Sequence, residues 1–394
     1  MSLFTTIAPI TITCHNRLAP YLEQEIKALG FELKETFVTG VKLEGTLNDC
    51  IRLNLNLRCA SQVLYSLLSF EAHHADDVYR ELQDCPWEDI IPEDGYFSIT
   101  SNVQNDSINN SMFANLRVKD AIVDRMRECT GKRPETGADL NGAVIHLFWK
   151  NDEAEVFIDS SGESLARHGY RKIPGRAPML EALAAATIMA SRWDGSSPFI
   201  NPMCGSGTLA IEAALYATNT RPGIFRSNYA FMHLNGYDAR VYQKEMDRLR
   251  KQIKQLPHEA KIIASDYSNQ AIANAQQNAK AAGVGYLIEF KECDFALTPV
   301  PEGKPGVFFI NPEYGERLGD VAELEITYGR IGTYMKQKCG GYFGYVFTGN
   351  LDLAKKIGLK PKRRIEFFTS TIDCRLFEYE LYSGSRRTDH KESE

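Results

Sequence analysis

From about Met179 onward, the sequence alternates helical segments with short apolar segments, and this alternation restricts the fold more than any other feature. The pattern predicts helices over residues 179–193, 208–217 and 269–282, and strands over residues 199–200, 261–265, 288–291 and 307–310. Single strands separated by helices require right-handed crossovers, which place the strands parallel in one sheet. We therefore expect a doubly wound α/β domain, with an antiparallel hairpin of residues 365–368 and 376–382 at the sheet edge.

The first 160 residues have the mixed pattern of small α+β domains. Helices are predicted over residues 18–30 and 111–129, and strands over residues 10–14, 96–100, 144–149 and 155–158. Residues 51–57 alternate apolar and polar side chains as a strand does, but their neighbours also permit a helix, so the type of this element is left open.

Composition and charge exclude several classes of protein. The 394 residues carry 45 basic and 51 acidic side chains, and the net charge of −6 argues against a general polyanion binder. No run approaches about 18 consecutive apolar residues, so we expect no membrane span. The nine cysteines include no C-x-x-C pair, which argues against a zinc site or a disulfide framework. Free thiols and the absence of a signal-peptide pattern favour a cytoplasmic protein, and we expect no metal.

The segment 201–208, NPMCGSGT, lies between a predicted strand and a predicted helix. Gly205 and Gly207 permit close approach of a ligand to the backbone, and the helix start offers unpaired N–H groups to an anion. The spacing also matches a loose dinucleotide fingerprint, which needs an acid about 20 residues later. The acid after the next clear strand, Asp266, lies much further on, which disfavours a nicotinamide site. A purely structural glycine turn is the other alternative.

Two acids follow predicted strands. Asp266 stands where doubly wound folds place a carboxylate that accepts the ribose hydroxyls of a nucleoside, although a helix N-cap is the alternative. Asp294 follows the strand at 288–291 and is placed to accept from an adenine amino group, or else is a solvated loop acid.

The tetrapeptide Asn311-Pro-Glu-Tyr314 follows the apolar strand at 307–310. The amine of a nucleobase is a weak nucleophile because its lone pair is delocalised into the ring. The Asn311 side-chain oxygen and the Pro312 carbonyl are two acceptors that can take both amine hydrogens and orient the lone pair, and Tyr314 can stack on an extruded base. A strand that ends in an ordinary Asn-Pro turn is the alternative.

These motifs together resemble the THUMP-domain class I RNA methyltransferases, in particular bacterial enzymes that methylate guanine in large-subunit ribosomal RNA. The strongest marks are residues 158–171, 201–208 with 211–214, 264–266 and 311–318, and weaker marks are residues 116–122 and 374–379. The resemblance implies a ferredoxin-like module at 1–65, a THUMP RNA-binding domain at 66–160, a linker at 161–178, a Rossmann-like methyltransferase domain at 179–385 and a polar tail at 386–394.

The resemblance also implies a role for each site residue. The amino-acid end of S-adenosylmethionine would lie on residues of the glycine loop, its ribose on Asp266 and its adenine on Asp294, and the target base would lie on Asn311, Pro312 and Tyr314. The residues implied for the loop are Asn201, Cys204, Gly205, Ser206, Gly207 and Thr208.

Two positions depart from the family pattern. Asn201 stands where the family usually has Asp, and Glu313 stands where it usually has a second proline. We expect Glu313 to replace part of the lost negative charge near the cofactor's ammonium group. The alternative is that Glu313 repels RNA phosphate and that catalysis is lost.

Basic residues gather in three segments, which favours contacts with RNA phosphate, although each segment alone is typical of a solvated face. The segments are 111–133, 167–176 and 351–364, and the predicted RNA contacts are Arg117, Lys119, Arg125, Arg167, Arg171, Lys362 and Arg363. The resemblance implies an S-adenosylmethionine-dependent methyltransferase that acts on the exocyclic N2 amine of a guanine in large-subunit ribosomal RNA, and the basic segments agree with an RNA substrate. Methylation of adenine N6 in RNA or DNA, and an RNA-binding protein with impaired catalysis, remain as alternatives.

Overall fold

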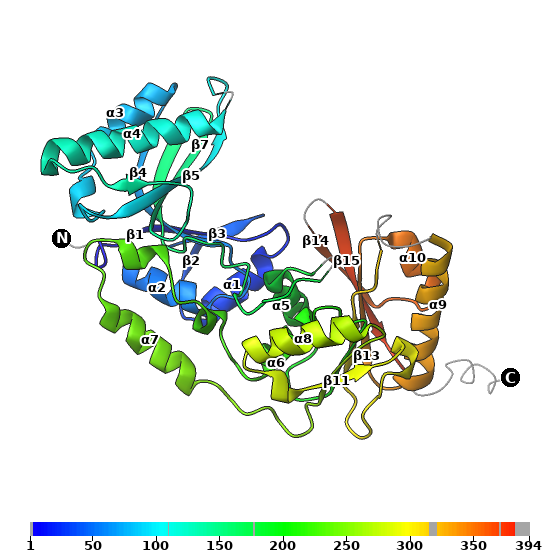
Figure 1. Cartoon of the computed structure of the whole chain (residues 1–394). Coiled ribbons are helices and arrows are strands. Elements are labelled where there is room, and N and C mark those ends of the chain that lie inside the picture. Colours follow the sequence, from blue (N-terminus) through cyan, green and yellow to red (C-terminus); the bar gives the residue numbers. More distant parts are fainter. Residues whose placement is uncertain (1–2, 109, 176–177, 315–320, 370–371, 383–394) are drawn as a thin grey trace. The chain divides into compact units, whose positions relative to one another are not determined.

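The computed structural model describes residues 3–108, 110–175, 178–314, 321–369 and 372–382 (Figure 1). The chain divides into two compact units. The first contains Met1–His15, Leu22–Arg167 and Arg221–Lys251, and the second contains Asn16–Tyr21, His168–Thr220 and Gln252–Glu394. Residues 221–251, which fall inside the predicted methyltransferase domain, therefore pack with the first unit. The boundaries expected for the individual domains stay predictions, and the tail at 386–394 lies outside the described residues.

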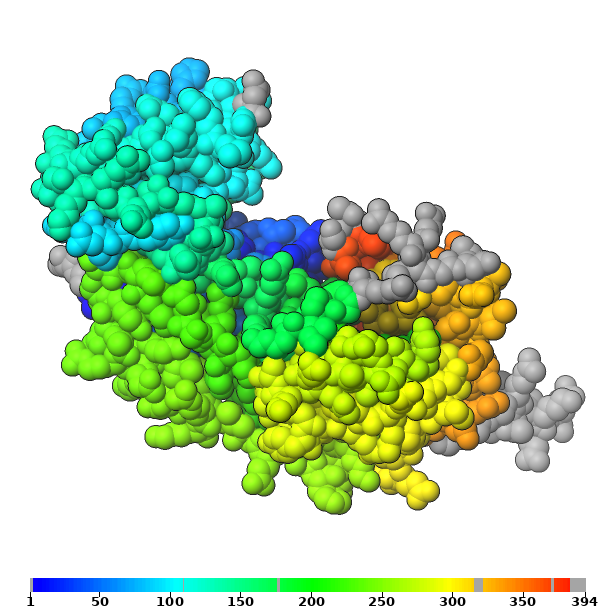
Figure 2. All heavy atoms as spheres, viewed as in Figure 1, coloured from blue at the N-terminus to red at the C-terminus, as the bar shows by residue number. Residues whose placement is uncertain are grey.

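The first unit is built on an eight-stranded sheet with the order β2-β3-β1-β4-β8-β7-β5-β6. Strand β4 pairs antiparallel with both β1 and β8, so the two predicted N-terminal modules share one sheet. Helices α3 and α4 pack against each other (Figure 1), and Figure 2 draws this part of the chain as the blue and cyan surface at the upper left. The strands are β1 (Ala8–Thr13), β2 (Leu33–Phe37), β3 (Gly40–Gly45), β4 (Gln62–Glu71), β5 (Tyr96–Gln104), β6 (Glu135–Thr136), β7 (Ala143–Lys150) and β8 (Glu153–Asp159). The helices in these parts of the chain are α1 (Ala19–Ala28), α2 (Leu47–Asn56), α3 (Ala75–Gln83), α4 (Ser111–Thr130) and α7 (Ala239–Lys251).

The segment whose type the alternation left open is helical and belongs to α2. Thr46 caps the helix in a reciprocal capping box with Asp49. The asparagines that produced the alternation are buried, and the Asn54 side-chain amide donates to the Cys50 carbonyl one turn earlier (2.8 Å) and to the Ser160 hydroxyl (2.8 Å). The polar positions are therefore buried contacts of a helix that is enclosed on several sides, and they do not mark the solvent face of a strand.

The second unit confirms the predicted doubly wound α/β fold. Its seven-stranded sheet has the order β11-β10-β9-β12-β13-β15-β14, with parallel pairing from β11 to β13 and the predicted antiparallel hairpin at the far end. The strands are β9 (Phe199–Pro202), β10 (Ile262–Asp266), β11 (Ile288–Glu292), β12 (Val307–Ile310), β13 (Phe343–Thr348), β14 (Arg363–Thr369) and β15 (Ile372–Glu380). The helices are α5 (Glu181–Ala190), α6 (Thr208–Ala217), α8 (Asn269–Ala281), α9 (Val321–Lys338) and α10 (Leu351–Lys356).

Both faces of this sheet are buried. Phe308 and Val346 belong to a hydrophobic cluster with residues of α9 and α10. The next residue along β12, Phe309, points to the other face and stacks between Phe199 and Tyr345. Among the described helices, none has the combination of length and apolarity that a membrane crossing requires.

Glu378 of β15 joins three strands through a buried charge. The side chain is fully buried, and its carboxylate accepts hydrogen bonds from Arg363 Nε (2.8 Å) on β14, from the Tyr345 hydroxyl (3.0 Å) on β13 and from Arg192 Nε (3.1 Å). Tyr345 and Arg363 are the residues directly opposite Glu378 in the two ladders. Removing the carboxylate would leave these donors without their acceptor.

We expect Glu378→Ala to lower the free energy of unfolding by about 2–3 kcal/mol, below the full cost of breaking a buried pair because both arginines keep some access to water. Glu289→Ala, which removes an exposed pair with Lys291, should change it by less than about 1 kcal/mol. Denaturant unfolding of the two variants checks this, and equal losses would contradict the role of Glu378.

Candidate functional site

The predicted site residues lie at the carboxyl ends of four adjacent parallel strands. Asn201 lies within β9, Asp266 ends β10, Asp294 follows β11 and Asn311 follows β12. Because β11, β10, β9 and β12 are neighbours in this order, the sheet topology brings all four residues to one edge. Open α/β sheets bind ligands at this edge.

The glycine loop is tied to the end of β10. The Cys204 N–H donates to the Ser265 carbonyl (2.9 Å), and the Gly205 N–H donates to Asp266 Oδ2 (3.0 Å). Gly207, at a φ of 83°, is the N-cap of α6, and no side chain caps this helix. The first backbone hydrogen bond of the helix is donated by the Ile211 N–H to the Gly207 carbonyl (2.9 Å). The N–H groups of residues 208–210 therefore point out of the helix start and have no partner within the helix. This geometry suits an anion such as a carboxylate.

Asp266 organises two turns and does not itself cap helix α8. Its Oδ1 accepts from the Ser268 N–H (3.0 Å), while Ser268 is the N-cap and accepts from the Ala271 N–H (3.3 Å). Each carboxylate oxygen thus accepts one backbone bond and keeps a further lone pair. The alternative of a simple N-cap at Asp266 is therefore excluded by the geometry, whereas its ribose contact stays a prediction.

Asp294 has a partner that the sequence did not indicate. Its Oδ1 accepts from the Ala296 N–H (2.9 Å) and from Arg330 (2.8 Å), whose guanidinium also lies 4.8 Å from the centre of the Phe295 ring. Burial alone would raise the pKa of Asp294, but the hydrogen bonds from Arg330 and Ala296 hold it below its ordinary value. Arg330 lies in α9, so only the fold brings it to this carboxylate.

Asn201 bridges the point where β9 and β12 stop pairing. The backbone ladder ends at Ile200 and Phe308, and the Asn201 side-chain amide then donates to the Phe309 carbonyl (2.9 Å). An aspartate at this position would have no such donor. The Glu313 side chain is exposed. Its compensation for the missing acid stays a prediction.

The segment predicted to hold the base is anchored from neighbouring elements. The Tyr328 hydroxyl contacts the Glu313 carbonyl (3.3 Å) and the Thr348 hydroxyl (2.8 Å). The Tyr314 hydroxyl lies 3.9 Å from the Cys374 sulfur, and burial raises the pKa of Tyr314 to about 12. Residues 315–318 of the motif lie outside the described residues.

Two buried amide oxygens face this edge without a donor in the described parts of the chain, namely Asn201 Oδ1 and Asn311 Oδ1. A buried acceptor without a partner costs free energy, so an unfilled Asn311 oxygen is consistent with a donor supplied by a ligand.

Most of the predicted RNA contacts are engaged within the protein. Ion pairs join Arg117 to Asp76, Lys119 to Asp120, Arg125 to Glu88, Lys362 to Glu380 and Arg363 to Glu378. The Arg171 side chain is 14% exposed and contacts Glu181. Arg167 is exposed, as are Arg127, Arg133, Lys360 and Arg364, and no ion pair is recorded for these five among the described residues. The basic segments of the sequence overstated the positive charge available to RNA, because acidic side chains from other elements pair with many of these cations.

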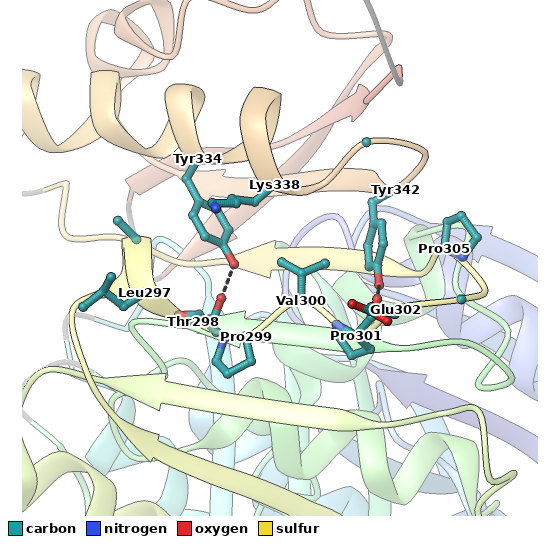
Figure 3. A pocket seen from close by; sticks show the side chains of 13 residues that line it. Leu297, Thr298, Pro299, Val300, Pro301, Glu302, Pro305, Tyr334, Lys338 and Tyr342 are labelled. Atoms are coloured by element: carbon teal, nitrogen blue, oxygen red, sulfur yellow. Dashed lines mark hydrogen bonds between the residues drawn. The ribbon is translucent and has the colours of Figure 1, made fainter.

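A separate hollow of about 640 Å³ lies between the segment that connects β11 to β12 and the C-terminal half of α9 (Figure 3). Its tyrosines are structural, because the Tyr334 hydroxyl donates to the Thr298 carbonyl (2.6 Å) and the Tyr342 hydroxyl to the Pro301 carbonyl (3.0 Å). None of the predicted site residues lines it. Over the described residues, no cluster of three or more His, Cys, Asp or Glu side chains is arranged to hold a metal.

Comparison with protein families assigns almost the whole chain. Residues 168–378 match the family described as "RMKL-like, methyltransferase domain". Residues 9–64 match "RlmL ferredoxin-like domain", and residues 72–159 match "THUMP domain".

The curated relatives are longer proteins. The "Ribosomal RNA large subunit methyltransferase K/L" of Syntrophotalea carbinolica is 34% identical over 388 residues, which are 95% of this chain and 54% of the relative. The protein of the same name from Psychromonas ingrahamii is 37% identical over 374 residues, or 92% of this chain and 49% of the relative. The chain thus spans about half the length of the curated relatives it matches.

Solved structures share the fold over nearly the full chain. A "predicted N6-adenine-specific DNA methylase" from Listeria monocytogenes is 29% identical with a TM-score of 0.85, covering 95% of this chain and 97% of that one. A "possible methylase" from Clostridium difficile is 26% identical with a TM-score of 0.84, covering 97% and 100%.

Alanine variants of Gly205, Gly207 and Gly283 distinguish two properties of the glycine loop, namely its packing against α8 and its ability to bind a ligand. All three sites have positive φ, so each variant carries strain of about 1 kcal/mol. At Gly207 the added Cβ would also lie 2.9 Å from the Ala275 Cβ, whereas Gly205 and Gly283 have open space within 4 Å. We expect Gly207→Ala to lower thermal stability most, and Gly205→Ala to match Gly283→Ala in stability but to lose affinity for S-adenosylhomocysteine.

Thermal unfolding and calorimetric titration measure the two effects. Equal stability of the Gly207 and Gly283 variants would contradict the packing of the loop, and unchanged affinity in Gly205→Ala would contradict the anion site.

Proposed function

This chain belongs to the RMKL-like methyltransferase family. We therefore propose that it transfers the methyl group of S-adenosylmethionine to the exocyclic N2 amine of a guanine, and that this guanine lies in large-subunit ribosomal RNA. The observation that carries the proposal is the joint placement, at one sheet edge, of a helix start without a side-chain cap, the two acids Asp266 and Asp294, and the buried Asn311 amide oxygen, which has no donor among the described residues. The class of RNA follows from the relatives, which are ribosomal RNA large subunit methyltransferases.

The described residues fit the proposed cofactor. Its carboxylate matches the free N–H groups at the start of α6, and hydroxyls of its ribose match the remaining lone pairs of Asp266. Asp294, fixed by Arg330, has its other oxygen for the adenine amino group. When bound there, the cofactor supplies an electrophilic methyl group.

Asn311, Pro312 and Tyr314 hold the nucleophile in this proposal. The Asn311 oxygen and the Pro312 carbonyl accept the two hydrogens of the amine, so the nitrogen lone pair faces the methyl group along the line of displacement. Tyr314 stacks on the extruded base, and its position is set by Cys374 and by Gly349, where a Cβ would come within 3.0 Å of the Tyr314 ring. Transfer would form the nitrogen–carbon bond as the carbon–sulfur bond of the donor breaks, with S-adenosylhomocysteine as the leaving group. The methylated nitrogen is then acidic enough to release one hydrogen to solvent as a proton, so these residues need to position the amine and need no strong base.

A second candidate is methylation of adenine N6. The same two acceptors fit the amine of adenine, and the similar structure from Listeria monocytogenes is that of a predicted N6-adenine-specific DNA methylase. A protein that binds cofactor and RNA without turnover is the third candidate, because Glu313 stands in place of a rigid proline. A cytoplasmic location, favoured by the free thiols, belongs to the same proposal.

Transfer of isotopically labelled methyl to ribosomal RNA, followed by nucleoside analysis, tests the proposal. We expect labelled N2-methylguanosine, and we expect Asn311→Ala to lower kcat at least about 100-fold with little change in cofactor affinity. Asn274→Ala, at an exposed hydrogen bond of α8, is the matched control and should retain activity. Labelled N6-methyladenosine would support the second candidate, and cofactor binding without transfer would support the third.

The cations of the first unit that have no ion pair among the described residues should carry the salt-dependent part of RNA binding. We expect Arg127→Ala with Arg133→Ala to reduce the slope of log affinity against log salt by about 0.7–0.9 per lost phosphate contact. Arg80→Ala, which removes a cation paired with Asp77, should leave the slope nearly unchanged. Binding titrations over a salt series check this, and a wild-type slope near zero would argue against an RNA substrate.

A further inference from the structure

Residues 168–173, which we call the strap, are the first residues of the second unit after the chain leaves the first unit at Arg167. The first four residues of the strap, 168–171, belong to the resemblance motif at 158–171, and the strap has no part in the function proposed above. Figure 2 shows this part of the chain, in green, against the yellow surface that includes α8. The strap is held there by polar side chains.

Two of these contacts tie the strap to the helix that follows the glycine loop. His168 Nδ1 lies 2.8 Å from Glu212 Oε1, and both side chains are fully buried. Arg171 Nη2 donates to the Thr208 hydroxyl (3.0 Å), in the first residue of α6. The same nitrogen donates to the Met179 carbonyl (2.5 Å) and lies 3.4 Å from the Glu181 carboxylate.

Asn278 of α8 makes the third contact, and it joins the strap to the glycine loop directly. Its Oδ1 accepts from the N–H groups of Lys172 (2.9 Å) and Ile173 (3.0 Å). Its Nδ2 donates to the carbonyls of Ile173 (2.9 Å) and Ser206 (3.1 Å). The side chain is 1% exposed, and these four bonds use its two donor hydrogens and both acceptor sites of its oxygen.

The bond to Ser206 matters because it fixes the peptide that leads into Gly207. Gly205 and Gly207 both have positive φ, and glycine is the residue with the greatest conformational freedom, so the loop depends on outside contacts for a single geometry. Asp266 holds the loop at Gly205 on one side. Asn278 and Arg171 hold it at Ser206 and Thr208 on the other side.

We propose that Asn278 and Arg171 are positioning residues for the cofactor, which act through Ser206 and Thr208 to set the N–H groups that receive its carboxylate. This inference rests on the proposed function. It assigns Arg171 to the cofactor loop instead of to RNA phosphate, because its side chain is only 14% exposed and its guanidinium contacts Thr208, Met179 and Glu181.

The positioning role requires the donor hydrogens of the Asn278 amide, and a side chain of the same volume without them should not fulfil it. Asn278→Asp keeps the size and both acceptor bonds to the strap, but it removes the two donor hydrogens. It also places a carboxylate oxygen against the carbonyls of Ile173 and Ser206. The glycine loop therefore loses its bond to α8 at Ser206, while the strap keeps the two N–H bonds that it donates to residue 278.

The test is calorimetric titration of the full chain with S-adenosylhomocysteine, together with RNA binding and thermal unfolding. We expect Asn278→Asp to weaken S-adenosylhomocysteine binding about tenfold or more with RNA affinity within about twofold of wild type. Arg171→Lys leaves Asn278 intact and cannot bridge Thr208, Met179 and Glu181 together, so it should weaken the same binding by about three- to tenfold. Asn274→Ala, one turn away on α8, should match wild type.

Wild-type affinity for S-adenosylhomocysteine in both folded variants would overturn the inference. Parallel loss of ligand and RNA affinity would also overturn it, because that pattern indicates general unfolding. Failure of the wild-type chain to bind S-adenosylhomocysteine would instead overturn the proposed function, so the two failures are distinguishable.

Discussion

The carboxylate of Asp266 closes two turns at once, and the geometry of the site depends on it. One oxygen accepts from the Gly205 N–H at the glycine loop, and the other accepts from the Ser268 N–H before α8. The helices that follow these two turns, α6 and α8, are thereby fixed to the end of one strand. Because glycines in the loop supply little rigidity of their own, the direction of the free N–H groups at the start of α6 is set by such contacts with neighbours.

Local patterns in the sequence predicted the parts of the site that lie within a few residues of a strand end. The glycine loop, Asp266 and Asn311 are found at one edge because strand, turn and helix signals are local and parallel topology does the rest. The family resemblance is confirmed by the matches over residues 9–64, 72–159 and 168–378. The roles of the single residues remain predictions.

Contacts between segments that lie far apart in the chain could not be predicted from the sequence. Arg330 reaches Asp294, and Asn278 reaches the strap, only through the packing of α9 and α8. The same limit explains the basic segments, since acids from other elements pair with Arg117, Arg125 and Arg363. Strand β13 was not predicted because it mixes glycine with aromatic residues. An added Cβ at Gly344 would lie 2.7 Å from the Met335 sulfur, so a larger residue there would have to displace that side chain.

We propose that four adjacent strand ends form one site for the cofactor and the target amine. A crystal structure of the chain with bound S-adenosylhomocysteine tests it most directly. We expect the ligand carboxylate at the start of α6, the ribose on Asp266 and the sulfur facing Asn311. A ligand bound elsewhere, or one whose sulfur faces away from Asn311, would contradict it.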